Sequence, residues 1–528
     1  MENKKTKIIS IGAVVALALT VITATYAYFQ AQVGDPAVAD IKVNANTVDT
    51  FTFSNGSAIS FSINQDNFAS GAGNQTGSTY ASAMLTANNK TNTATEHYYM
   101  YLNIENNTFT YSINTNTPEI IMTVKNSVGN EVTDISTLNH VIVTGANGTQ
   151  VSGYDITNKS GLITLFDNRE ITTTSSKEEK WNITITFVNY DENQNANAGK
   201  SMSAKVMIQK EVIPQVVSDV CSNGTNLATC ITTLANKSIP SATNIYHHDS
   251  SLSNGAGDNS YRYAGASDVV NNFVCFGSNE STCPTDNLYR IIGVFGNNVK
   301  LIKYDYGTTD ELGTDGDYNQ TYKEWGMDST YKGTYGDGER IGVYYWNKST
   351  QKNTWSESLL NKTNLNTNFI NNIGEEWANK IATTTWKVGG NTYSNIYSKT
   401  PSVVYQNEIV NPVTTNTTDN ATEYTAKIGL MYVSDYGFAA EPSAWTLTMG
   451  NYNNTAATST NWMYMGLYEW TLSRRADSSY RAFDVNGNGY VRDFNVSGSD
   501  AVRPSFSLES FITYVSGSGS ASDPMVIN

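Results

Sequence analysis

Residues 181–187 read Trp-Asn-Ile-Thr-Ile-Thr-Phe, in which every second side chain is apolar and those between are polar. Alternation of this kind over a short run is typical of a β-strand with one buried face. The same alternation recurs along the first part of the chain, at residues 59–63, 100–104, 109–113 and 202–208. Because residues typical of turns separate these runs, the sequence predicts an all-β domain of antiparallel strands over residues 35–210.

The density of short strands in 35–210 favours a sandwich of immunoglobulin-like type. This region contains a single tryptophan, Trp181, which its place in an alternating run assigns to the core. His97 and His140 are expected at the surface. No combination of catalytic residue types stands out, so we expect this domain to be structural.

The first 34 residues have the pattern of an export segment. Lys4, Lys5 and Lys7 precede a stretch from Ile8 to Gly34 that carries no charge. Positive residues followed by a long apolar run are typical of a signal peptide, and about 20 apolar residues also suffice to span a bilayer. The lysines place the N-terminus inside and the remaining chain outside. Both a cleaved signal peptide and a single-pass membrane anchor fit, and a buried core helix is the alternative. We expect an extracellular or cell-surface protein.

The composition narrows the class of protein. With 528 residues, the chain is expected to form roughly two or three domains. Its formal net charge is −15 and no basic stripe occurs, which argues against nucleic-acid binding. The polar character comes from Asn, Thr, Ser and Gly, and 33 tyrosines supply aromatic surface. This mixture favours strands joined by many turns.

The chain has four cysteines, Cys221, Cys230, Cys275 and Cys283. In an exported protein, an even number of cysteines close in sequence favours disulfides. Three pairings are open, of which the two local ones, Cys221–Cys230 and Cys275–Cys283, are favoured. A zinc site is the alternative, but neither spacing is that of a zinc knuckle.

The remaining chain is expected to comprise a connector over 211–270 and an α+β domain over 271–528. The connector is polar and rich in turn residues, with a short helix predicted near residues 226–235 and a His247-His248-Asp249 triplet. Adjacent histidines point in different directions on a regular element, so a loop or packing role is preferred over metal binding.

Strands and helices are both predicted in 271–528. The apolar runs 288–294 and 299–304 flank a Gly-Asn-Asn turn and predict a hairpin. Residues 359–377 have apolar side chains at helical spacing, 428–433 read as a buried strand, and 483–494 as a second hairpin. Strands on both sides of a helical stretch favour an α+β domain.

Two motifs carry a resemblance to known proteins. Residues 465–471, Met-Gly-Leu-Tyr-Glu-Trp-Thr, and 502–506, Val-Arg-Pro-Ser-Phe, resemble segments of the formylglycine-generating-enzyme-like, C-type-lectin-related fold. More broadly, the chain from 286–295 through Arg503 resembles an uncharacterised domain common in surface proteins of gut-dwelling Gram-positive bacteria. The 35–210 region and its Tyr-Ala-Tyr-Phe junction at 26–29 resemble exported proteins of the same bacteria and, distantly, the camelysin-type matrix family.

The resemblance implies a binding scaffold instead of an enzyme. The enzymes of that fold use a pair of cysteines late in the domain, since their reaction requires an activated thiolate. No cysteine follows Cys283, so the late cysteine pair is missing, and no histidine follows His248, so a histidine-based nucleophile system is missing from the C-terminal domain as well. Lectin-related domains present variable loops on a stable core, which favours a glycan or protein ligand.

The segment 484–489, Asp-Val-Asn-Gly-Asn-Gly, matches the opening of a calcium loop. Asp484, Asn486 and Asn488 would supply oxygen ligands at positions 1, 3 and 5, so calcium is the one cofactor considered. Position 12 is Asn495 instead of Glu, and the flanks resemble strand ends, so a plain hairpin turn is preferred. Glu441-Pro442-Ser443 approaches the Glu-Pro-Asn triplet of calcium-dependent lectins, but Ser lacks the required amide oxygen.

An aromatic-rich stretch supplies the candidate ligand-binding residues, Trp445, Trp462 and Tyr464. Aromatic rings beside polar groups stack on sugars or anchor a protein partner. Trp470 is expected in the core, and Arg503 either in an internal ion pair or in hydrogen bonds to the backbone.

The sequence therefore predicts a non-enzymatic cell-surface protein that binds a glycan or protein ligand. The alternatives are a subunit of an extracellular matrix or filament, which would associate through strand edges, and an extracellular hydrolase with a carboxylate pair.

Overall fold

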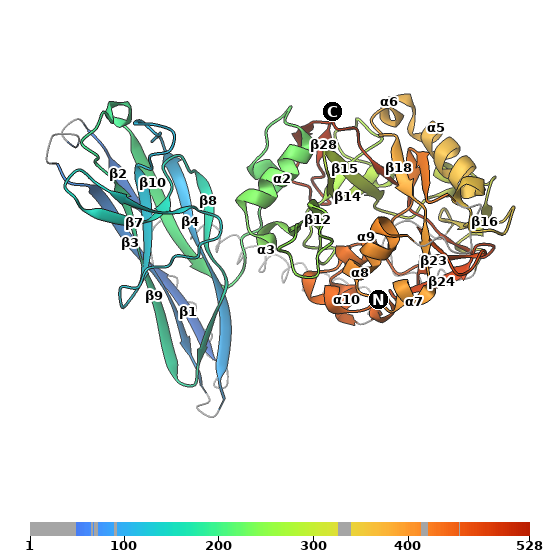
Figure 1. The fold of residues 1–528 in the computed structure, drawn as a ribbon, viewed down its shortest axis with the longest axis horizontal. Coiled ribbons are helices and arrows are strands. Elements are labelled where there is room, and N and C mark those ends of the chain that lie inside the picture. Colours follow the sequence, from blue (N-terminus) through green and yellow to red (C-terminus); the bar gives the residue numbers. More distant parts are fainter. Residues whose placement is uncertain are drawn as a thin grey trace, which may run out of the picture. The chain divides into compact units, whose positions relative to one another are not determined.

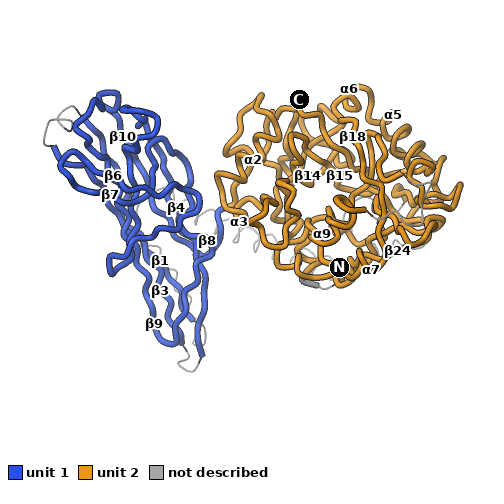
Figure 2. The backbone as a smooth tube through the Cα atoms, viewed as in Figure 1, with its two compact units in different colours: residues 1–213 blue, residues 214–528 orange. Residues whose placement is uncertain are grey.

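The computed structural model describes residues 49–528, apart from 65–66, 68–71, 89–91, 326–338, 413–420 and 454. The chain divides into two compact units, unit 1 (1–213) and unit 2 (214–528), coloured separately in Figure 2. Strands predominate over the described residues as a whole (Figure 1), which confirms the expectation of a β-rich protein with several domains. The predicted export segment, 1–34, lies outside the described residues. Among those described, no helix is long and apolar enough to cross a membrane.

Unit 1 consists of two antiparallel sheets. A six-stranded sheet has the order β1-β3-β9-β5-β7-β6, and a four-stranded sheet has the order β2-β10-β4-β8. The strands are β1 (Thr50–Asn55), β2 (Ile59–Ser62), β3 (Gln75–Thr86), β4 (Ala94–Asn107), β5 (Ile120–Asn126), β6 (His140–Thr144), β7 (Gln150–Asp155), β8 (Gly161–Thr173), β9 (Ser176–Phe187) and β10 (Ser201–Gln209).

Strand β9 contains the alternating run 181–187 and lies between β3 and β5 in the larger sheet. Its Ile183 and Ile185 are fully buried, and they share one hydrophobic cluster with Leu102 of β4 in the smaller sheet. The two sheets therefore pack face to face around a common core. The Trp181 ring lies at this core and donates a hydrogen bond of 2.9 Å to the hydroxyl of Tyr98.

The run 109–113 does not form the predicted strand. Its backbone is bound by a buried side chain, because one carboxylate oxygen of Glu119 accepts hydrogen bonds from the amides of Ser112 and Ile113. A backbone held in this way is not available for a strand ladder. Only the Phe109 side chain follows the prediction, since it is buried.

Unit 2 contains two seven-stranded sheets. The first has the order β11-β12-β14-β15-β26-β21 with β13 on β14, and the second β16-β17-β25-β22-β23-β24 with β19 on β22; β18-β20 and β27-β28 form two-stranded sheets. The strands are β11 (Ile245–His248), β12 (Ser260–Tyr263), β13 (Phe273–Cys275), β14 (Leu288–Phe295), β15 (Asn298–Lys303), β16 (Tyr318–Thr321), β17 (Gly342–Tyr345), β18 (Thr384–Lys387), β19 (Gly390–Asn391), β20 (Glu423–Ala426), β21 (Ile428–Gly429), β22 (Glu469–Arg475), β23 (Arg481–Val485), β24 (Val491–Asn495), β25 (Ser499–Ala501), β26 (Ser505–Ser507), β27 (Tyr514–Ser516) and β28 (Val526–Ile527).

The helices of unit 2 are short. They are α2 (Leu227–Lys237), α3 (Pro240–Thr243), α4 (Thr309–Leu312), α5 (Ile370–Ile373), α6 (Glu375–Ala378), α7 (Tyr393–Tyr397), α8 (Pro401–Tyr405), α9 (Val433–Ala439) and α10 (Thr455–Ser459), with π-helical η7 (Leu360–Phe369) and η8 (Gln406–Val410). The helix predicted over 359–377 is thus η7, α5 and α6 in succession. Gly374 lies between α5 and α6, and its φ of 80° is outside the helical range, so the helix is interrupted there. Glycine suits this position because a residue with a side chain rarely adopts that conformation.

The segment predicted as a connector, 211–270, belongs to unit 2 from Pro214 onward. Helix α2 is capped by the preceding residue, Asn226, whose side chain accepts a hydrogen bond from the Thr229 amide. The apolar face of the helix is buried in the core of unit 2. Strands β11 and β12 join the first sheet. The polar turns between these elements gave the segment the composition of a connector, although the elements themselves are core.

Both disulfides lie in unit 2. They join Cys221 to Cys230 and Cys275 to Cys283, the two local pairs that the spacing favoured. The first ties the chain ahead of α2 to that helix, and the second closes the loop between β13 and β14.

Candidate functional site

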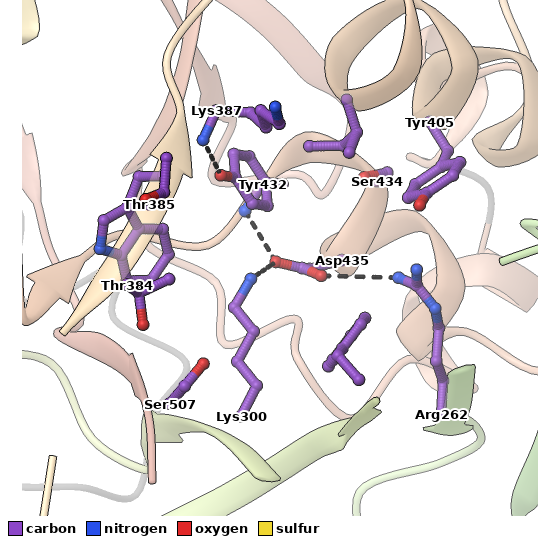
Figure 3. Close-up of a pocket in the computed structure, with 13 residues that line it drawn as sticks. Arg262, Lys300, Thr384, Thr385, Lys387, Tyr405, Tyr432, Ser434, Asp435 and Ser507 are labelled. Atoms are coloured by element: carbon purple, nitrogen blue, oxygen red, sulfur yellow. Dashed lines mark hydrogen bonds and ion pairs between the residues drawn. The ribbon is translucent and has the colours of Figure 1, made fainter. Parts of the chain in front are cut away.

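A cavity of about 200 Å³ lies in unit 2 where the first sheet meets β18 and helices α8, η8 and α9. We call it the Asp435 pocket, after the residue on which its charged side chains converge (Figure 3). The side chains that line it are those of Arg262, Phe295, Lys300, Thr384, Thr385, Trp386, Lys387, Tyr405, Ile409, Tyr432, Ser434, Asp435 and Ser507.

The position of Asp435 is set by the start of helix α9. Its Oδ2 atom accepts a hydrogen bond of 3.0 Å from the amide of Tyr432, the residue that precedes the helix. A carboxylate in the first turn satisfies a free backbone amide and interacts favourably with the positive end of the helix. The fold of α9 therefore fixes this carboxylate before any cation approaches it.

Two cations approach Asp435 from opposite sides (Figure 3). Lys300, on β15, places Nζ 2.5 Å from Oδ2, and Arg262, on β12, places Nη1 3.6 Å from Oδ1. All three side chains are almost fully buried. The shorter contact is a charge-assisted hydrogen bond, whereas 3.6 Å exceeds hydrogen-bond range.

Arg262 is held in place by its remaining nitrogens. Nε donates to Ser260 Oγ at 2.8 Å and Nη2 donates to Asp258 Oδ2 at 2.6 Å. Burial opposes ionisation of Asp258, but the charge of Arg262 and hydrogen bonds from Ser260 outweigh it and hold the pKa of Asp258 at about 2. The guanidinium is thus fixed with Nη1 directed at Asp435.

Aromatic rings surround the Lys300 ammonium. Nζ lies 4.5 Å from the centroid of the Tyr432 ring and 5.4 Å from that of Trp386. Burial lowers the pKa of Lys300, while Asp435 acts in the opposite direction. Rings at these distances attract a cation through their negative faces and partly replace its lost hydration.

A second buried carboxyl group, Glu408, lies beside the same helix start. Its two oxygens accept hydrogen bonds from the amides of Val433 and Ser434, at 2.9 and 3.0 Å. Burial raises the pKa of Glu408 to about 7 in spite of these bonds. Asp435 contributes to this rise because two neighbouring carboxylates disfavour ionisation of each other.

The ion pairs of the pocket are balanced. Arg262 and Lys300 are matched by Asp258 and Asp435, and Lys387 at the rim forms an ion pair with Glu423. Glu408, whose pKa is about 7, adds at most one further negative charge behind the pocket. The pocket thus offers hydrogen-bond donors and acceptors and aromatic walls without a large net charge. Among the described residues, no group of three His, Cys, Asp or Glu side chains is arranged to hold a metal ion.

The aromatic residues proposed from the sequence do not line this pocket. Trp445 is fully buried and donates a hydrogen bond to the carbonyl of Ala440, and Trp462 is 2% exposed and donates to the carbonyl of Tyr263. Tyr464 is half-buried and donates to the carbonyl of Gly487. Trp445 and Trp462 hold loops together inside the core, and neither ring has an exposed face in this structure.

The predicted calcium loop is a hairpin turn between β23 and β24. Asp484 is fully buried and accepts a hydrogen bond of 2.8 Å from Arg492 Nε. The Asn486 side-chain oxygen accepts from the amide of Asn488, and the Asn486 amide donates to the carbonyl of Tyr490. One oxygen of Asp484 and the side-chain oxygen of Asn486 are therefore engaged within the hairpin, as in an ordinary turn.

The two histidines of the His247-His248-Asp249 triplet lie in different environments. His248 is buried, and its Nδ1 accepts a hydrogen bond from the amide of Ala256; burial lowers its pKa to about 2. His247 stacks on Tyr261, with ring centroids 4.2 Å apart. In the Glu441–Ser443 triplet, the serine hydroxyl donates to the carboxylate of Glu441.

The residues of the Asp435 pocket were not identified from the sequence. One local signal exists, because Lys300 is a charged residue within the otherwise apolar core of strand β15. A buried lysine requires a partner. That partner, Asp435, is 135 residues away, so the sequence pattern alone does not reveal it.

No protein-family model matches the sequence, and none of the curated proteins is similar enough to count as a relative. The Asp435 pocket is therefore interpreted from its own geometry.

Proposed function

We propose that this chain is an exported cell-surface protein of the non-enzymatic, adhesive class, and that unit 2 binds a glycan or protein ligand in the Asp435 pocket. The observation that carries the proposal is the pocket itself, in which aromatic walls surround a fixed set of buried charged groups. Concave sites with mostly apolar walls and a few precisely held polar groups are typical of ligand binding.

In this proposal unit 1 is an immunoglobulin-like spacer and unit 2 is a lectin-related binding domain, as in surface proteins of gut-dwelling Gram-positive bacteria. The two facing antiparallel sheets of unit 1 support the first assignment, and the mixture of sheets and short helices in unit 2 supports the second. Likeness of fold does not establish function, so the binding claim depends on the pocket.

Two features support export. Residues 1–34 have the composition of a signal or single-pass membrane segment. All four cysteines form disulfides, which persist mainly in oxidising compartments.

The test is to express the full chain with its leader in a Gram-positive host. Protease added to intact cells should degrade it, and cells that display it should adhere to a glycoprotein-coated surface more strongly than cells that lack it. Intact protein inside the cell with four reactive thiols would overturn export. Display without any gain in adhesion to glycan or protein coatings would overturn the binding function.

A specific observation favours the filament or matrix subunit as a second candidate. Strand β6 is an edge strand of the larger sheet in unit 1, and its Ile142 is 65% exposed. Unprotected edge strands with exposed apolar side chains promote association between chains. This candidate predicts that the purified protein forms polymers visible by light scattering, and that Ile142→Lys prevents them.

A hydrolase is less well supported. Glycoside hydrolysis requires two carboxyl groups that face substrate across a cleft. In the Asp435 pocket, the carboxylates of Asp258 and Asp435 are each engaged by a cation. We therefore propose binding without turnover.

A further inference from the structure

We infer that the Asp435 pocket takes a single uncharged sugar ring, recognised through a hydroxyl group placed between Arg262 and Asp435. This inference rests on the proposed binding function and specifies its ligand. Three properties of the pocket carry it: the gap between the two charged groups, the balance of charge and the size of the cavity.

The gap is chemically selective. Arg262 Nη1 and Asp435 Oδ1 are 3.6 Å apart, too far for a hydrogen bond, and both belong to groups that line the cavity. Arginine only donates and an ionised carboxylate only accepts. A hydroxyl does both, so it accepts from Arg262 and donates to Asp435 at once. A carbonyl only accepts and a protonated amine only donates, so each satisfies only one of the two groups.

The charge balance excludes a charged ligand. A carboxylate-bearing sugar would gain the attraction of Arg262 and Lys300 but would meet Asp435 at the same point, with Asp258 behind Arg262. A cationic group would meet two buried cations. Because an unpaired charge in a buried site is strongly unfavourable, a neutral ligand is preferred.

The walls and the volume suit one ring. Half-buried rings of Phe295, Tyr405 and Tyr432 line the cavity, and aromatic faces pack well against the C–H face of a sugar. The volume of about 200 Å³ lies below the roughly 300–1,000 Å³ of sites for drug-sized ligands. The pocket therefore accommodates one terminal residue of a glycan, with the remaining chain outside.

Two neighbouring residues of helix η8 give a matched pair of variants. Ile409 lines the pocket, whereas Val410 does not line it and is 50% exposed. Ile409→Trp fills the cavity with an indole ring, and Val410→Trp adds the same ring at a surface position. Each variant is first compared with wild type for its thermal unfolding transition, so that loss of binding is not confused with loss of folding.

The experiment is isothermal titration calorimetry of the full chain with three sets of oligosaccharides that differ in the terminal residue: neutral hexose, uronic or sialic acid, and free amino sugar. We expect binding of neutral-terminated sugars, a loss of about tenfold or more in affinity for Ile409→Trp, and wild-type affinity for Val410→Trp. Ile409→Trp with wild-type affinity would overturn the site.

The remaining outcomes separate this inference from the proposed function. Binding of acidic or amino sugars that Ile409→Trp abolishes would overturn the neutral-ligand inference and leave the binding function standing. Adhesion of cells to protein coatings with no sugar bound in calorimetry would do the same. Neither sugar binding nor adhesion would overturn both.

Discussion

The two units bury their polar side chains differently. Among the described residues of unit 1, Glu119 is the only buried side chain of an acidic or basic residue. Its oxygens accept hydrogen bonds from backbone amides and side-chain amides of the same unit. Unit 2 instead buries several arginine and lysine side chains in its core, namely Arg262, Arg290, Arg474, Arg503, Lys300 and Lys303. A sandwich core is thus specified mainly by alternation, whereas the core of unit 2 also requires ion pairs between distant segments.

This difference has a consequence for function. Buried ion pairs contribute little net stability compared with apolar residues of the same shape, but removal of one partner is costly. Groups held so firmly are suited to recognise a ligand, since they do not reorganise when it binds. We therefore expect unit 2 to be the functional unit and also the more sensitive to single charge substitutions.

The largest effect is expected at the Arg503–Glu469 pair. Arg503 donates two hydrogen bonds to Glu469, and both side chains are buried. Arg503→Ala should lower the stability of unit 2 by about 3–5 kcal/mol because it leaves a buried carboxylate unpaired. Scanning calorimetry should show a shift of the unit 2 transition alone.

Two controls belong with Arg503→Ala. The double variant Arg503→Met, Glu469→Met should recover much of the loss, since it leaves no unpaired charge. Arg340→Ala breaks a pair with Asp286 in which both side chains are 45% exposed, and it should cost at most about 1 kcal/mol. Equal effects of Arg503→Ala and Arg340→Ala would refute the contrast between buried and exposed pairs.

Unit 1 should respond most to loss of an apolar side chain. Ile183→Ala creates a cavity between the two sheets and should lower the stability of unit 1 by about 2–5 kcal/mol. Ile142→Ala on the exposed edge should change it by less than about 0.5 kcal/mol. Scanning calorimetry of the full chain measures the shift of the unit 1 transition; a similar loss for both variants would contradict the assigned core.

Stability of unit 2 should depend on pH through Glu408. Its pKa is about 7 in the folded chain, above the ordinary value of 4.5, so the folded state holds a proton that the unfolded state releases. Between pH 4.5 and 7 this group therefore stabilises unit 2 at low pH, and that contribution is lost as the pH rises.

The variant Glu408→Gln isolates this effect. It removes the Glu408 contribution, so the difference in Tm between wild type and variant should change between pH 5 and 8 and stay constant above pH 8. Buried His248 acts in the opposite direction, because its pKa of about 2 disfavours the folded state as the pH falls below 6.5. The His248 contribution is the same in wild type and in Glu408→Gln, so it cancels in the difference in Tm between them. A difference independent of pH would contradict the raised pKa.

The smallest effect tests whether residues 214–270 belong to unit 2. Asn226 caps helix α2 through a hydrogen bond of 3.1 Å from the Thr229 amide to its side-chain oxygen. Asn226 Nδ2 also donates to the carbonyls of Ser510 and Ile512. Asn226→Ala should therefore destabilise unit 2 by about 1 kcal/mol or more, whereas Asn226→Asp keeps the cap acceptor and loses only the bonds from Nδ2. If Asn226→Ala left the unit 2 transition unchanged, residues 214–270 would be a connector and not part of unit 2.

The sequence was sufficient where the determinants were local. The alternation in 181–187 predicts strand β9 because each side chain faces core or solvent according to its own position. The turn after Phe295 predicts the β14–β15 hairpin for the same reason. Of the two alternatives expected for Arg503, an internal ion pair or backbone bonds, the structure shows both, with Glu469 and with the carbonyl of Met463, although neither partner was named.

The Asp435 pocket could not be predicted from local sequence patterns. Its charged groups come from strands β12 and β15 and helix α9, which only the sheet topology brings together. Conversely, Trp445 lies in a stretch of mixed polar and apolar residues, yet it packs in one cluster with Ala256 and Ala264, which are far away in the sequence. Asp484 matched a metal motif by spacing alone, and Arg492 on the neighbouring strand neutralises it. Residue types and spacing do not specify such contacts.

The most direct test of a ligand site in unit 2 is hydrogen–deuterium exchange of the full chain, with and without a saturating mixture of neutral hexose-terminated oligosaccharides. The account predicts slower exchange in the segments that line the Asp435 pocket, 384–387, 405–409 and 432–435, and unchanged exchange throughout 49–213. Protection confined to unit 1, or no protection in these three segments under conditions where calorimetry detects binding, would contradict it.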